Sequence, residues 1–290
     1  MASTWTVVDG LGVDEQRSVE RLLALIEQRT GDEALTEAQR ERLDAHLHVR
    51  HALRHDETGA LTGYAVISDG ATTEAEPAIG TFDLELARRL EHEPRPVSLL
   101  LRTVLPEIET RLEERGWRPE RALHRLHRPL PARAPPPSGI AVHAFVPGQD
   151  DEAWVTLNNQ AFAGHPSQGN MTLERLRARF KASWFDPEGL RLYFDDEVLV
   201  ASCWTKVHRT SEGEVGEIYV VAVAPSAQGR GIGRFAVLEG LDFLASRGIR
   251  EGELYVEESN HAAYALYVAL GFTYASRIVE FRLDEPAAAR

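Results

Sequence analysis

The sequence predicts an α/β (α+β) fold with two tandem domains, each a mixed and mostly antiparallel sheet flanked by helices. Its 290 residues are 43% hydrophobic, which is enough material for two cores of ordinary size. A proline-rich stretch divides the chain near its middle, and similar patterns follow one another on both sides of it. We therefore expect one domain over residues 1–130, a linker over 131–139 and a second domain over 140–290.

Two pairs of segments indicate that the halves share one organisation. Residues 56–70, "DETGALTGYAVISDG", and 194–208, "FDDEVLVASCWTKVH", each have the pattern of a β-hairpin. Near the end of each half, a helical pattern stops at a glycine followed by an aromatic residue, and a strand-like run follows; the two pairs are Gly116-Trp117 and Gly271-Phe272. A duplicated unit of helices and strands explains both observations.

The charge and the cysteine content limit the classes of function and location. With 45 acidic residues against 32 Lys and Arg, the formal net charge is −13, which argues against a general affinity for nucleic acid or anionic membranes. The single cysteine, Cys203, excludes an intrachain disulfide, and no segment has the pattern of a signal peptide or a membrane span. We expect a cytoplasmic monomer with no nucleic-acid or membrane partner.

A glycine-rich turn in the second half joins a predicted strand to a predicted helix. The strand, "EIYVVAVAP" over 217–225, is rich in β-branched residues and stops at Pro225, and the helix runs from about Ile232 to Gly248. Between them, "QGRGIG" has the spacing G-x-G-x-G, which differs from the dinucleotide fingerprint and lacks the Lys-Ser or Lys-Thr of a phosphate loop. Such a turn brings backbone N–H groups and the positive end of a helix to a pyrophosphate. The alternative is a flexible turn without a ligand.

The first half lacks this turn. Where it would fall, the sequence reads "ATTEAEPAIGTFDLE", which has no Q-x-x-G-x-G pattern. We therefore expect one pyrophosphate site per chain, in the second half.

Two other features carry less functional weight. The segment "HLHVRHALRH" contains four histidines, His46, His48, His51 and His55. Ala52 stands where a zinc-binding H-E-x-x-H motif has its glutamate, and the segment also has the pattern of a strand, so we expect no bound metal. Cys203 lies among apolar residues of a predicted strand, and we expect a buried small side chain rather than an acyl carrier.

Several motifs resemble known acetyltransferases. The strand "EIYVVAVAP", the turn "QGRGIG" and then "NHAAYALYVALGF" (260–272) follow one another as in the Gcn5-related N-acetyltransferases. The segments "NNQAFAGHPSQGNMT", "WFDPEGL", "WTKVH" and "LYVEESN" resemble more narrowly the mycothiol synthase family, tandem acetyltransferases of actinobacteria that acetylate the cysteinyl amine of desacetylmycothiol. The first half matches that family only through "DEQRSV" and "LTEAQ", and it departs from the family by lacking a glycine turn.

The resemblance implies acetyl-CoA as co-substrate and assigns residues to it. In these acetyltransferases the strand before the turn contains a bulge and separates from its neighbour, which frees backbone groups to bind the thioester and the pantetheine arm. The matching positions are Val221, Ala222, Val223, Gln228, Gly229, Arg230, Gly231, Ile232, Gly233, Arg234, Asn260, His261, Ala262, Ala263, Tyr264 and Ala265. Without the resemblance, the apolar side chains of 221–223 would indicate only a core.

Direct acetyl transfer to an amine needs a base for the amine and an acid for the departing thiolate. Glu217, which begins the predicted strand, could take the amine proton directly or through one water, and by resemblance it also binds the amine. Tyr267 matches the general acid of the superfamily, because a phenol with a pKa near 10 stays protonated at neutral pH and can give its proton to a thiolate. The alternatives are a solvated carboxylate for Glu217, a core residue for Tyr267, and Tyr264 as a competing acid.

The acceptor carries many hydroxyls, so a complementary site needs charged and polar side chains. By resemblance its contacts are Glu37, Asp186, Lys206, Glu217 and Tyr255. Glu37 comes from the first half, which would put the acceptor between the two domains. Taken singly, each of these residues could also be a surface charge or a packed aromatic.

Three functions remain in view. The first is acetylation of the cysteinyl amine of desacetylmycothiol by acetyl-CoA, two small-molecule substrates. The second is acetylation of another small amine or a protein N-terminus, and "AFAGHP" and "WFDP" argue against it. The third is a non-catalytic acyl-CoA-binding protein, which would have no need of Glu217 together with Tyr267.

Overall fold

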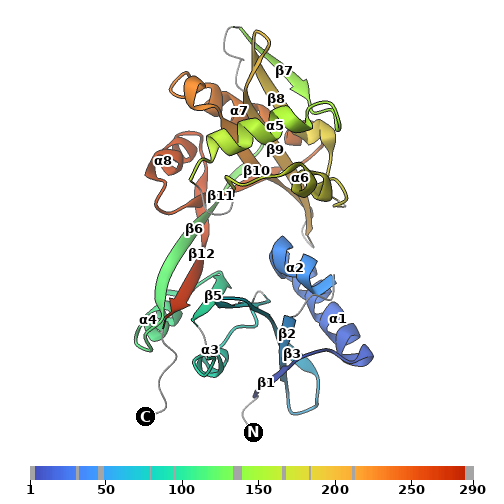
Figure 1. The fold of residues 1–290 in the computed structure, drawn as a ribbon, viewed down its shortest axis with the longest axis vertical. Helices are drawn as coiled ribbons and strands as arrows, with labels where there is room; N and C mark the ends of the chain where they lie inside the picture. The colour runs from blue at the N-terminus through green and yellow to red at the C-terminus, as the bar shows by residue number, and fades with distance from the viewer. Residues whose placement is uncertain are drawn as a thin grey trace.

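The computed structural model describes residues 4–30, 33–44, 49–78, 80–94, 96–132, 139–164, 168–182, 184–210 and 213–284. The first half of the chain forms β1 (Trp5–Val8), α1 (Val13–Thr30), α2 (Glu37–Asp44), β2 (Val49–His55), β3 (Leu61–Asp69), β4 (Thr73–Pro77), α3 (Leu84–Leu90), β5 (Val97–Arg102), α4 (Pro106–Glu113) and β6 (Arg118–Pro129). The second half forms β7 (Ile140–Ala144), α5 (Asp151–Ala161), α6 (Leu173–Arg179), η1 (Pro187–Gly189), β8 (Leu190–Asp195), β9 (Val198–Thr210), β10 (Gly213–Val223), η2 (Pro225–Ala227), α7 (Ile232–Ser246), β11 (Glu251–Glu257), α8 (His261–Ala269) and β12 (Thr273–Leu283). Apart from the short turns η1 and η2, the order of elements is the same in both halves, so the predicted tandem α/β units are present (Figure 1).

The strand connections match as well. β2, β3 and β4 are antiparallel neighbours, as are β8, β9 and β10. In each half a helix then crosses to a parallel strand: α3 joins β4 to β5, and α7 joins β10 to β11. The glycine-rich turn therefore stands at the start of the crossover helix of the second half.

The last strands of the two halves are exchanged. Twelve strands form one sheet in the order β1-β2-β3-β4-β5-β12-β6-β11-β10-β9-β8-β7. β12 pairs with β5 of the first half, β6 pairs with β11 of the second, and β6 and β12 run side by side between the halves (Figure 1). The domain bounds 1–130 and 140–290 follow the order of the sequence and remain a proposal. Of the linker, the structure describes only residues 131, 132 and 139.

Helices cover both faces of the second half's strands. On β9, Cys203 lies against Gly240 of α7, whereas the next residue, Trp204, packs edge-on against Trp154 of α5 with ring centroids 5.3 Å apart. Successive strand residues face opposite sides of a sheet, so α7 and α5 lie on opposite faces. Cys203 is fully buried, as predicted, and burial raises the pKa of its thiol.

The predicted hairpins are present, with one shift. Residues 194–208 contain the β8–β9 turn, with Asp196 at φ 53°. Residues 56–70 contain a turn and β3, but the partner strand is the preceding β2, which includes His51 and His55. His51 bonds the Tyr64 hydroxyl at 2.8 Å, and His46 and His48 lie outside the described residues. No helix in the described part of the chain is both long and apolar enough to cross a membrane.

Candidate active site

Strands β10 and β11 separate at the centre of the second half. They pair in parallel at Gly216 with Gly252 and at Glu217 with Glu253. Beyond that point β10 continues along β9 as far as Val223, and β11 continues along β6 as far as Glu257. A register shift interrupts β10 between 218 and 220. Within the described strands, β10 is therefore not paired with β11 over residues 221–223. This agrees with the strand separation that the sequence resemblance implies.

The glycine-rich turn follows this edge. Gly229 has φ 75° and Gly231 has φ 79°, a region that favours glycine, and Gly231 is the residue that precedes the first turn of α7. Among the described residues, no side chain caps this helix end and no heavy atom lies within 4 Å of where a Cβ would stand on either glycine. Unfilled space over uncapped backbone N–H groups fits an incoming phosphate.

The remaining residues of the predicted acetyl-CoA site belong to this turn and to the start of α8. Gln228 and Arg234 are exposed, Ile232 is buried, and Arg230 is 2.7 Å from the Asp195 carboxylate. At the start of α8, the Asn260 side chain accepts a hydrogen bond from the Ala263 N–H at 3.1 Å. The exposed residues of that first turn are His261, Ala262 and Ala265.

The first half closes the equivalent position with its own carboxylate. Asp83 precedes α3 and accepts hydrogen bonds from the N–H groups of Glu85 at 3.0 Å and Leu86 at 3.2 Å. The indole N–H of Trp5 donates to the same carboxylate at 2.9 Å, and Arg54 forms an ion pair with it. The end of α3 that would meet a phosphate is therefore already occupied by an anion.

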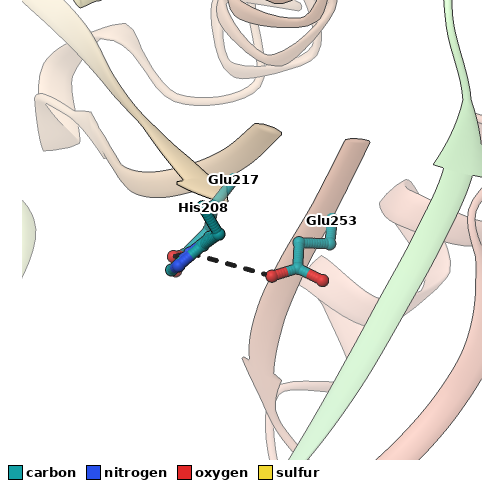
Figure 2. Close-up of side chains that lie close together, drawn as sticks. All are labelled: His208, Glu217 and Glu253. Atoms are coloured by element: carbon teal, nitrogen blue, oxygen red, sulfur yellow. Dashed lines mark hydrogen bonds and ion pairs between the residues drawn. The ribbon is translucent and has the colours of Figure 1, made fainter. Parts of the chain in front are cut away.

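Glu217 lies in a cluster of ionisable side chains at the point where β10 and β11 part. The Nε2 of His208 is 2.6 Å from Glu217 Oε2 and 3.8 Å from Glu253 Oε1. Figure 2 shows His208 and Glu217 together, with Glu253 facing them from the neighbouring strand. Arg125 of the exchanged strand β6 donates to Glu253 from Nε at 2.8 Å and Nη2 at 2.6 Å.

Burial and neighbouring charges shift two of these groups. Burial raises the pKa of Glu253, although Arg125 opposes the shift. Burial acts to lower the pKa of His208, but the hydrogen bond to Glu217 and its negative charge outweigh that effect, so the pKa of His208 is raised. The ligand atoms of His208, Glu217 and Glu253 lie within 4.8 Å of one another, yet Glu253 binds Arg125 and Glu217 binds His208. Each of the two carboxylates therefore already has a nitrogen partner in the structure.

Lys206 lies where two of the motifs that resemble the family meet. It is opposite Glu217 in the β9–β10 register, is 4% exposed, and lies over the Trp184 ring at 4.9 Å and the Tyr219 ring at 5.7 Å. Its ammonium group forms an ion pair with Glu33, which precedes α2 in the first half. The motifs "WTKVH" and "WFDP" therefore meet beside Glu217.

The other predicted acceptor residues differ in position. Tyr255 is two residues beyond Glu253 on β11, on the same face of the sheet. Asp186 caps η1 by accepting from the Glu188 N–H at 3.0 Å, and it lies 3.3 Å from Arg247. Glu37 begins α2, but its side chain lies outside the described part of the chain.

Tyr267 stands on α8 with its ring against Phe272, at a centroid distance of 5.8 Å. Burial and the nearby Cys203 raise the pKa of its phenol to about 12. Tyr264, the competing residue, packs edge-on against His124 at 5.3 Å. A phenol with so high a pKa stays protonated throughout the neutral range, as a general acid requires.

Sequence reasoning missed four charged residues of the site: His208, Glu253, Arg125 and Glu33. A signal existed for His208, because it follows Lys206 by two residues and a strand puts alternate residues on one face. Arg125 and Glu33 had no local signal, since they reach the site through the strand exchange and a contact between the halves.

The comparisons with known proteins identify the family of the chain. The chain matches the model of the acetyltransferase (GNAT) family over residues 152–272. It is 40% identical over 243 residues to a mycothiol acetyltransferase of Catenulispora acidiphila, covering 77% of each chain. It is 41% identical over 244 residues to that of Kytococcus sedentarius, covering 80% of this chain and 81% of the relative. The chain belongs to the mycothiol acetyltransferase family. As a family member it is an acetyl-CoA-dependent acetyltransferase, as the sequence predicts.

Solved structures support the fold of the family member. A GCN5-related N-acetyltransferase from Sphaerobacter thermophilus superposes with a TM-score of 0.68 at 24% identity, over 97% of this chain and 95% of that one. A tandem GNAT protein from the clavulanic acid biosynthesis pathway superposes with a TM-score of 0.63 at 14% identity, over 97% and 98% of the two chains. The predicted α/β fold with tandem acetyltransferase-like units is confirmed.

Proposed function

We propose that this chain transfers the acetyl group of acetyl-CoA to the cysteinyl amine of desacetylmycothiol, giving mycothiol. The observation that carries the proposal is the meeting of Glu217, paired with His208, and Lys206, held by Trp184, where β10 and β11 part. A carboxylate at that point can receive an ammonium group, and the cation beside it can receive the hydroxyls or carbonyl of a polar acceptor.

The second half is the proposed site of acetyl-CoA, and one chain is proposed to bind one molecule. The uncapped start of α7 with its two positive-φ glycines suits the pyrophosphate, and the unpaired edge of β10 over 221–223 suits the pantetheine arm and the thioester. In the first half, the Asp83 carboxylate occupies the matching helix end. A monomer and a cytoplasmic location are proposed with it; the buried, unpaired Cys203 fits a reducing compartment.

Two side chains are proposed to move the protons. Glu217 takes one proton from the acceptor ammonium, which leaves a neutral amine to attack the thioester carbonyl. As the C–N bond forms and the C–S bond breaks, the electron pair of the C–S bond stays on sulfur, and Tyr267 donates its proton there. Loss of the second amine proton completes the amide and restores Tyr267 through solvent. One proton is released per acetyl transferred.

The acceptor is proposed to lie between the halves. Lys206 and Tyr255 are on the face of the sheet that carries Glu217, and Glu33 comes from the first half to Lys206. Glu37 is proposed to act from the start of α2. Asp186 is proposed to join them when the acceptor is bound, because its carboxylate otherwise caps η1 and faces Arg247.

The test is a product assay by mass spectrometry. The protein is incubated with acetyl-CoA and desacetylmycothiol, with free cysteine, with a glucosaminyl-inositol that lacks the cysteinyl group, and with a peptide that has a free N-terminus. We expect a hydroxylamine-stable acetyl group, as an amide requires, on desacetylmycothiol far faster than on the others. Preferred acetylation of the peptide or of the glucosamine amine would replace this function by another acetyltransferase, and no turnover with acetyl-CoA bound would leave an acyl-CoA-binding protein.

A further inference from the structure

His208 forms the short hydrogen bond to Glu217 and is 12% exposed, yet the mechanism above gives it no part. We propose that His208 is a positioning residue for Glu217 that stores, until the end of each turnover, the proton that Glu217 removes from the acceptor ammonium. The inference deepens the proposed function and rests on it for the identity of the ammonium.

Glu217 and His208 pair with each other, because the neighbouring Glu253 and Lys206 each have another partner of opposite charge. On β11, Glu253 is bound by Arg125 of β6, so these two opposite charges compensate each other. On β9, Lys206 is bound by Glu33 in the same way. His208 is the side-chain hydrogen-bond partner that the described part of the chain offers to Glu217. A buried carboxylate is costly without a compensating positive charge, so the pair retains one proton.

This arrangement makes two cations compete for one carboxylate. In the free enzyme the imidazolium of His208 compensates Glu217, and an acceptor ammonium brings an equivalent charge to the same oxygens. Binding of the ammonium therefore releases the His208 proton to solvent and leaves a neutral imidazole, with Nε2 2.6 Å from Glu217. The neutral imidazole can then accept one proton from Glu217, to which its Nε2 is already hydrogen-bonded.

The proton balance closes over one cycle. One ammonium proton passes to Glu217 and on to Nε2 of His208, which restores the imidazolium. The second leaves the nitrogen as the amide forms and replaces the proton that Tyr267 gives to sulfur. The third remains on the amide. After the products leave, the next acceptor ammonium displaces the stored proton from His208.

The same competition predicts a pH dependence. Four charged groups face His208: Lys206 on its own strand β9, Glu217 on β10, Glu253 on β11, and Arg125 of β6 behind Glu253. Burial and Lys206 act to lower the pKa of His208, but the hydrogen bond to Glu217 and the negative charges of Glu217 and Glu253 outweigh them and raise it above its ordinary 6.5. Below that pKa the imidazolium holds Glu217 against the incoming ammonium. Activity at low acceptor concentration, kcat/KM, should therefore fall as the pH drops through a value above 6.5.

The first test is the pH profile of His208→Gln. Glutamine keeps an N–H donor near the position of Nε2 but does not titrate, so it preserves the hydrogen bond and removes the proton store. We expect the near-neutral acid limb of kcat/KM to disappear, and kcat at pH 8 to fall by roughly 10²-fold, the lower end for a positioned proton acceptor. The acceptor's own ionisation is common to both proteins and cancels. A His208→Gln profile parallel to that of the wild type would overturn the proposal.

His127→Gln is the matched control. His127 also faces a carboxylate, with Nδ1 2.5 Å from Glu251, but its side chain is 42% exposed and lies outside the cluster. Its replacement removes a histidine–carboxylate pair of the same kind and should leave the profile unchanged.

The second test measures the ionisation of His208 in the absence of substrates. NMR titration of the His208 imidazole, assigned by the signal lost in His208→Gln, should give a pKa above 6.5 that falls in Glu217→Gln, because the negative charge and the hydrogen bond that raise it are then removed. An unchanged titration in Glu217→Gln would overturn the inference whatever the acceptor is. If the pKa of His208 falls in Glu217→Gln but the enzyme does not acetylate desacetylmycothiol, the pairing of the two residues is supported and the proposed function is refuted.

Discussion

Replacing Gly231 by valine would test the phosphate-binding turn directly. The residue has φ 79°, and no described heavy atom lies within 4 Å of its Cβ position, so a Cβ there is strained by the backbone conformation but has room. The left-handed region costs an L-residue about 1–2 kcal/mol, and the new side chain stands over the uncapped N–H groups of α7. One substitution therefore has two separable effects.

Gly80→Val supplies the matched control. Gly80 lies in the corresponding connection of the first half, between β4 and α3, with φ 74° and no described heavy atom within 4 Å of its Cβ position. Its strain equals that of Gly231→Val, but the helix that follows is capped by Asp83. For both variants, about 1–2 kcal/mol lowers Tm by roughly 2–8 °C.

Affinity for CoA should separate the two variants. Loss of one hydrogen bond from a backbone N–H to a charged phosphate corresponds to about 1.5–3 kcal/mol, or roughly a 10- to 100-fold weaker Kd, for Gly231→Val alone. Isothermal titration with CoA, after thermal unfolding has shown both variants folded, gives the comparison. Wild-type affinity in a folded Gly231→Val, or equal weakening in Gly80→Val, would refute the assignment of the turn.

Four further outcomes follow from the same structure. Asp83→Ala should destabilise the chain by about 0.5–2 kcal/mol through loss of the α3 cap, and titration should still find one CoA per chain. Tyr267→Phe should lower kcat by roughly 10²-fold or more with unchanged Kd for CoA, and since the wild-type pKa is about 12, raising the pH to 10 should not reproduce the defect. Glu217→Ala should lower turnover by on the order of 10²-fold at neutral pH, and pH–rate profiles should show the deficit shrinking as the amine becomes neutral. Because the pKa of His208 is raised, its pairing with Glu217 stabilises the fold fully below pH 6.5 and less as the pH rises through the folded-state pKa, so His208→Gln should lower Tm more at pH 6 than at pH 9.

The parts of the fold that could be predicted are those with local signals. β10 ends just before Pro225, Gly231 has a positive φ before α7, and the hairpin turn at Asp196 lies between β8 and β9. Each of these depends on a few adjacent residues. The strand exchange depends instead on which edge β12 meets after the whole chain has folded, because β12 pairs with both β5 and β6.

The site divides in the same way. Glu217 and Lys206 could be found because motifs surround them, and the register of β9 with β10 then put them opposite each other. Glu253 has no such motif, and its partner Arg125 is 128 residues away on a strand that sequence order assigns to the other domain. Pairing of this kind becomes visible only when the strand order is known.

The first half supplies charged residues to the candidate site of the second half. Its strand β6 forms the edge against which β11 pairs from Glu251 to Glu257, and it carries the Arg125 that compensates Glu253. Without Arg125, Glu253 would stand uncompensated 3.8 Å from His208, and its negative charge would hold the imidazolium proton more tightly. Glu33 likewise compensates the positive charge of Lys206, whose side chain is almost fully buried. These two contacts link the charged groups beside the Glu217–His208 pair to residues supplied by the first half.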